Sequence, residues 1–191
     1  MIFLKKHWPI LLLCIAIVSG ASSAFAIDDG LNYGKKAGGK YVDVYYAPGL
    51  DAAQLSPQLN IRSSDEILTG QSMKSTNSNE VDLARMLDTL FLKVSDILDM
   101  HLYSLKMTIK ICKTVTELND VYEHLFNASL GGRRSFYVYD LNSIYVSGEA
   151  FQAGIIGHEM SHAIISHYFA NPAPVKVQEV LAMYVEYNLK K

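Results

Sequence analysis

The strongest constraint on the fold of this chain is a pair of histidines, His158 and His162, that enclose Glu159 within a strongly apolar segment. The segment reads His-Glu-Met-Ser-His, and the four-residue spacing places both imidazoles on one face of an α-helix. Its surroundings are apolar on nearly every side, which predicts a buried helix. The apolar neighbours are Ile155, Ile156, Met160, Ala163, Ile164, Ile165 and Phe169. Two imidazoles and a carboxylate are costly there unless a metal ion or a set of hydrogen bonds satisfies them.

The metal interpretation of this motif has a chemical basis. On one helix face, His158 and His162 can reach a single zinc ion. Glu159 lies at the edge of that face, where it can act as a general base on water without displacing it. A motif with only three fixed positions also arises by chance in unrelated proteins. The buried context of this one favours the metal interpretation over a chance match. Gly154 and Gly157 weaken the helix and predict that another element approaches closely on that turn.

A catalytic zinc site needs a third protein ligand and an open position. The extended pattern with a third histidine requires glycine at position 165 and histidine at position 168, and this chain has Ile165 and Tyr168. We prefer Glu179, because a short proline-containing turn can fold the next helix back against the motif. Glu186 is the competitor. It lies two turns further on, about 10 Å along the helix axis, so both acids cannot bind one ion, and we expect Glu186 outside the ligand set.

The first 26 of the 191 residues resemble a secretory signal. Lys5 and Lys6 precede an apolar run over 9–18, and Ala24-Phe25-Ala26 matches a cleavage site. The run is shorter than the roughly 20 residues of a membrane span. We therefore expect residues 1–26 to be a signal peptide and 27–191 to be one domain. The expected location is the periplasm or the exterior, with no stable membrane span after cleavage.

The net charge of the chain limits the classes of partner it can bind, and its cysteine content limits the disulfides it can form. Residues 1–26 contain two lysines and no acid, so their removal takes the net charge from −2 to −4. No basic stripe is present, and nucleic acid is not an expected partner. Cys112 would then be the single cysteine, which excludes an intrachain disulfide. We expect a covered thiol on a sheet.

Periodicity along the chain predicts an α+β fold. Residues 27–40 are expected to be a loose lead, and 69–79 a polar loop. Strands are expected at 41–46 and 105–112, with a strand or tight hairpin at 136–146. Helices are expected near 50–62, from 80 to 98, at 114–126, from about 147 to 170, and at 175–189.

Helix starts are also predicted. Thr114 and Glu117 form a capping-box pattern. Ser147 is expected to cap the motif helix, with Glu149 as an acid in its first turn.

At this point the chain resembles a known group. The segments His-Glu-Met-Ser-His and Gln-Glu-Val-Leu-Ala-Met-Tyr-Val-Glu-Tyr are similar to those of the gluzincin zinc metallopeptidases, in minimal form. The resemblance implies zinc, one ion per chain, with ligands His158, His162 and Glu179 and with Glu159 as the catalytic base. Ala182 and Tyr184 match the small and aromatic positions that follow the glutamate ligand.

The resemblance also implies a zincin-like fold. Such a fold has a small mixed sheet packed on the buried motif helix and on a C-terminal helix that carries the glutamate. An edge strand, expected within 136–146, lies beside the cleft and pairs with extended substrate. Val180 and Met183 depart from the pattern, which often has glycine and an acid there. The chain also ends soon after Glu179, so we expect an open cleft or one that a partner chain completes.

The function implied is hydrolysis of peptides or proteins by a secreted or periplasmic zinc-dependent peptidase. Zinc would lower the pKa of bound water toward about 7 and polarise the scissile carbonyl. Two alternatives remain: a zinc-binding but inactive periplasmic interaction module, and an amidase acting on a cell-wall-type substrate. Tyr168, Tyr184 and Tyr187 are near the motif in sequence, and none is assigned as the donor to the oxyanion.

Overall fold

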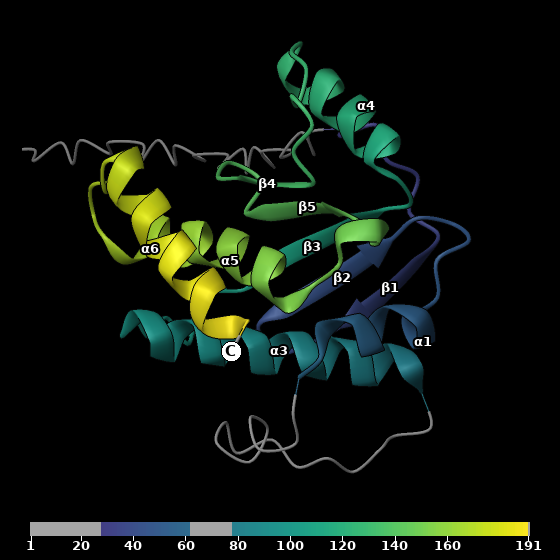
Figure 1. Cartoon of the computed structure of the whole chain (residues 1–191). Helices are drawn as coiled ribbons and strands as arrows, with labels where there is room; N and C mark the ends of the chain where they lie inside the picture. Colours follow the sequence, from purple (N-terminus) through teal and green to yellow (C-terminus); the bar gives the residue numbers. More distant parts are fainter. Residues whose placement is uncertain (1–27, 62–77, 191) are drawn as a thin grey trace, which may run out of the picture.

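A five-stranded mixed sheet forms the centre of the computed structural model, which describes residues 28–61 and 78–190 (Figure 1). The strand order is β1-β2-β3-β5-β4. The three central strands are mutually parallel, and the two edge strands, β1 and β4, are antiparallel to their neighbours. The strands are β1 (Lys35–Gly38), β2 (Val42–Tyr46), β3 (Met107–Cys112), β4 (Ser135–Val138) and β5 (Ser143–Ser147).

Helices cover both faces of this sheet. Figure 1 shows α4 on one face and α1, α3 and α5 on the other, with α6 packed along α5. The described part of the chain contains α1 (Ala52–Leu55), α3 (Asn79–Leu98), α4 (Val115–Phe126), α5 (Ala153–Tyr168) and α6 (Val175–Leu189), together with the 3₁₀ turns η1 (Ser56–Leu59) and η2 (Gly148–Ala150). The α+β class predicted from the sequence is confirmed.

Alternation along the strands determines which face each side chain covers. Ile109 and Ile111 of β3 are fully buried against the α3 and α5 side. Cys112 has the opposite parity and packs with Leu118 and Val121 of α4. Burial raises the pKa of the Cys112 thiol to about 12. The covered thiol expected from the sequence is therefore observed, and Cys112 forms no disulfide with any described residue.

One buried carboxylate fixes the start of β2. Asp88 of α3 accepts hydrogen bonds from the backbone N–H groups of Lys40, Tyr41 and Val42, at 2.6, 2.8 and 3.0 Å. A Cβ on Gly39 would lie 2.6 Å from the same carboxylate, so this position has no room for a side chain. The long helix and the sheet are thus joined by a polar contact as well as by the apolar core.

The observed elements agree with most predicted ranges. Thr114 caps α4 by accepting from the Glu117 N–H at 3.2 Å, and the Glu117 carboxylate accepts in return from the Lys113 N–H. The 136–146 segment is the β4–β5 hairpin. The predicted loose lead over 27–40 was wrong in part, because β1 pairs with β2 there.

The predicted start of the motif helix was also wrong. Ser147 is the last residue of β5, where it pairs with Cys112 and donates its N–H to the Arg134 carbonyl at 3.1 Å. It precedes the short turn η2, at whose N-cap position it makes no side-chain hydrogen bond, and it does not cap α5. Glu149 lies in η2, and α5 begins only at Ala153, after Gln152. The strand extends further than the capping pattern indicated, and the helix is correspondingly shorter.

Two predictions concern other parts of the chain. The signal peptide over 1–26 lies outside the described residues, as does most of the loop over 69–79. Within the ranges that the structure describes, no helix has the length and apolar character needed to cross a bilayer.

Candidate metal centre and cleft

Close packing of α6 on α5 creates the site. A Cβ on Gly157 would lie 2.2 Å from Leu189 Cδ1, and one on Gly154 would lie 3.1 Å from Lys190 Cε. The close approach predicted from these two glycines is therefore confirmed. Ala182 and Val185 are the buried residues of α6, so α6 presses a narrow face against the glycine turn of α5.

This packing brings one carboxylate to two imidazoles. His158 Nε2 and His162 Nε2 are 3.3 Å apart. Glu179 places Oε2 3.6 Å from His158 Nε2 and Oε1 3.6 Å from His162 Nε2. One ligand atom from each residue lies within 4.8 Å of the others, so the three residues form a group that could hold a metal ion.

The outer nitrogens of both histidines face α6 as well. Glu186 Oε2 lies 3.3 Å from His158 Nδ1, a buried atom with no hydrogen bond of good geometry to any described residue. The other Glu186 oxygen pairs with Lys190 Nζ at 2.5 Å. Glu186 thus touches the back of His158, on the opposite side of the ring from Glu179.

Gln178 has the matching position behind the second histidine. Its Oε1 is 3.4 Å from His162 Nδ1, and its Nε2 donates to the Ala173 carbonyl at 2.8 Å. The second bond fixes the amide so that its oxygen faces the ring. Sequence reasoning missed Gln178, although it immediately precedes the predicted ligand Glu179.

Glu159 is buried beside the histidine pair. It is 7% exposed and accepts a hydrogen bond from Ser135 Oγ at 2.7 Å. Burial raises the pKa of the Glu159 carboxyl above its ordinary value, and the Ser135 hydrogen bond and the charges of His162 and Arg133 oppose that rise. Ser135 was also missed from the sequence, since it lies one residue before the predicted 136–146 segment.

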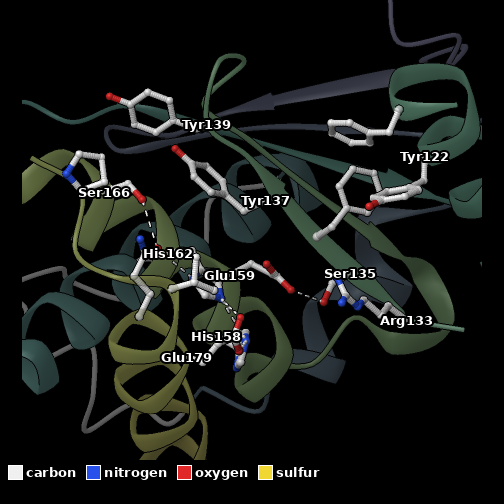
Figure 2. Close-up of a pocket in the computed structure, with 15 residues that line it drawn as sticks. Tyr122, Arg133, Ser135, Tyr137, Tyr139, His158, Glu159, His162, Ser166 and Glu179 are labelled. Atoms are coloured by element: carbon white, nitrogen blue, oxygen red, sulfur yellow. Dashed lines mark hydrogen bonds and ion pairs between the residues drawn. The ribbon is translucent and has the colours of Figure 1, made fainter. Parts of the chain in front are cut away.

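A cavity of about 630 Å³ opens over these groups. Figure 2 shows the two histidines and Glu159 between the β4 side and Glu179. An aromatic cluster forms one part of the wall, where Tyr122 packs 4.7 Å from Phe126 and 5.0 Å from Phe136 between ring centroids. This volume falls in the range of small-molecule and cofactor sites, about 300–1,000 Å³.

The edge strand β4 borders this cavity and offers unpaired backbone groups. Ser147 donates to the Arg134 carbonyl, so residues 134, 136 and 138 direct their backbone groups toward β5. Ser135 and Tyr137 consequently direct theirs away from β5. No other strand of the described sheet pairs with that side of β4.

The three tyrosines close to the motif in sequence do not reach the cavity. Tyr168, Tyr184 and Tyr187 are each about half exposed, and none of them lines it. Tyr137 and Tyr139, from β4 and the turn after it, line it instead. Strand alternation could have indicated Tyr137, because it shares a face with Ser135.

Comparison of the chain with protein-family models, with curated proteins and with solved structures found no match. The geometry and chemistry of the site itself are therefore the evidence for its function.

Proposed function

We propose that this protein is a zinc-dependent peptidase with a minimal zincin-like fold. The observation that carries the proposal is the convergence of His158, His162 and Glu179 beside the buried carboxylate of Glu159. Two imidazoles and one carboxylate are a ligand set of catalytic zinc sites that retain an open position.

The separations within the site support zinc. Ligands held at about 2.0–2.2 Å in a tetrahedral arrangement lie roughly 3.3–3.6 Å from one another. The nitrogen–nitrogen separation is 3.3 Å, and each imidazole nitrogen lies 3.6 Å from a different one of the two Glu179 oxygens. Small side-chain movements would satisfy all three bonds.

The chain's own residues then have distinct tasks. When bound, zinc supplies Lewis acidity toward a carbonyl oxygen and toward water. Glu159 accepts a proton from the attacking water and delivers it to the leaving amine. The Ser135 hydroxyl holds one oxygen of that carboxylate, which leaves the other oxygen for proton transfer.

The edge strand supports a peptide as the substrate class. An extended peptide can add to a free strand edge through main-chain hydrogen bonds. The outward backbone groups of Ser135 and Tyr137 run along the cavity next to Glu159. We further propose, from residues 1–26, that the protein works in the periplasm or outside the cell.

A comparison of wild type with Glu159→Gln tests the proposal. Both should copurify with about one zinc per chain. Glu159→Gln should hydrolyse a denatured protein or a peptide library about 10²–10⁴ times more slowly. Ser147→Ala is a matched control, because this buried residue lies away from the cavity.

Each other outcome has a defined meaning. Zinc-loaded wild type that cleaves neither peptides nor amides would indicate an interaction module. Hydrolysis of cell-wall-type amides, with peptides untouched, would indicate an amidase. A metal-free wild type whose peptide cleavage survives Glu159→Gln would contradict the mechanism.

A further inference from the structure

The cleft continues past the metal centre toward two arginines. A second hollow, of about 290 Å³, shares Arg133, Ser135, His158 and Glu159 with the main cavity. Arg134 also lines this second hollow. The two hollows therefore adjoin each other at Ser135, His158 and Glu159, near the start of β4.

The backbone holds these arginines in place at the start of β4. Gly131 and Gly132 both have positive φ, 68° and 77°, a conformation that favours glycine, and together they turn the chain into the strand. The Arg134 carbonyl is then bonded to Ser147 of β5. Both arginines are exposed, and among the described residues neither side chain makes a hydrogen bond or an ion pair.

The acids near the arginines already have other partners. Glu186 is paired with Lys190 and touches His158. Glu159 is held by Ser135. Arg133 thus acts on the Glu159 carboxyl only through its charge, and neither guanidinium group forms an ion pair with a described carboxylate.

The direction of a bound peptide follows from two independent points. Antiparallel pairing is the more stable arrangement on a strand edge, and it places the C-terminal part of a peptide at the start of β4, beside Arg133. Separately, Glu159 must reach the leaving amine, which lies C-terminal to the scissile carbonyl, and Glu159 is held on the Ser135 side.

We propose that Arg133 and Arg134 form a carboxylate subsite that selects peptides with an acidic group C-terminal to the scissile bond. Guanidinium groups bind carboxylates through paired, charge-assisted hydrogen bonds. The carboxylate comes either from an Asp or Glu side chain or from the free C-terminus of the peptide. This inference rests on the proposed peptidase function.

The test uses labelled peptide pairs and two readouts. The pairs differ only in Asp versus Asn, or in a free versus an amidated C-terminus, which separates the two sources of the carboxylate. Binding is measured by fluorescence anisotropy with zinc-loaded Glu159→Gln chain. Cleavage by wild type is mapped by mass spectrometry. Arg133→Gln/Arg134→Gln is compared with Lys36→Gln/Lys40→Gln, which removes the same charge at the opposite edge of the sheet.

We expect acidic peptides to bind about tenfold more tightly than their neutral partners, and the arginine double variant to abolish that ratio. The lysine control should preserve it, and cleavage should place the carboxylate C-terminal to the cut. The subsite is contradicted if the acidic and the neutral peptide of a pair bind equally tightly. It is also contradicted if the difference in affinity persists in the arginine double variant. If the affinity ratio depends on the arginines but no peptide is cleaved, the carboxylate subsite is supported and the proposed peptidase function is contradicted.

Discussion

The two helices of the candidate metal centre contribute in different ways. On α5, His158 and His162 are joined by one helical turn, and their side chains are only 20% and 15% exposed. On α6, Glu179 is 51% exposed and reaches the histidines only because the two helices pack at Gly157. The histidine pair is thus a local property of one buried helix, whereas the position of the third candidate ligand depends on tertiary packing.

The largest expected effect on zinc affinity distinguishes the contribution of α5 from that of α6. His162→Ala should lower zinc affinity by more than about 100-fold, because it removes a ligand from the buried pair. Glu179→Ala should lower affinity less, since an exposed position lets water replace the carboxylate. Competition with a fluorescent zinc chelator measures both, with exposed Lys176→Ala on α6 as the control. Equal losses for the two ligand variants would contradict the distinction.

A bulky residue at the contact between α5 and α6 should separate Glu179 from the histidine pair. Gly157→Leu would push α6 away from α5 and lower the free energy of unfolding by about 1–3 kcal/mol. Zinc affinity should fall as well, since Glu179 moves while the histidines stay. Chemical denaturation and the chelator assay report the two effects.

Gly157→Ala combined with Leu189→Ala is the matched control for that experiment. The smaller Leu189 side chain removes the atom that a Cβ would meet at 2.2 Å. Zinc affinity should therefore remain near that of wild type in this pair. Unchanged affinity in Gly157→Leu would show that helix packing does not position Glu179.

The smallest expected effect concerns the residues of α6 behind the histidines. Glu186→Gln and Gln178→Leu should each lower zinc affinity about tenfold, because partners on the outer nitrogen orient the ligand ring. Far-ultraviolet circular dichroism should remain unchanged, and Asn188→Ala on the exposed side of α6 serves as the control. A loss of fold in either variant would assign it a structural role instead.

The residues that could be predicted from the sequence are those whose regular spacing along the chain places them on one face of a helix. Four-residue periodicity located α5 and its histidines, and the glycines of the same helix predicted the contact with α6. The preference for Glu179 over Glu186 matches the group that the structure brings together. Met183 is exposed, and Glu186, one turn further, contacts His158.

The contributions that sequence missed depend on contacts between distant segments. Ser135 meets Glu159 only because the hairpin folds β4 beside α5, and Gln178 faces His162 only after α6 folds back. Ser147 carried a capping signal, but it ends β5 and precedes only the short turn η2, while α5 starts six residues later, at Ala153. Spacing along the chain contains none of this information.

The most direct test of the account is the zinc content of purified chains at matched concentration. We predict about one zinc per chain in wild type and in Glu159→Gln, and a large deficit in His158→Ala/His162→Ala, with only wild type cleaving peptides. Wild type that holds no zinc, or a double-histidine variant that holds as much zinc as wild type, would contradict the central claim.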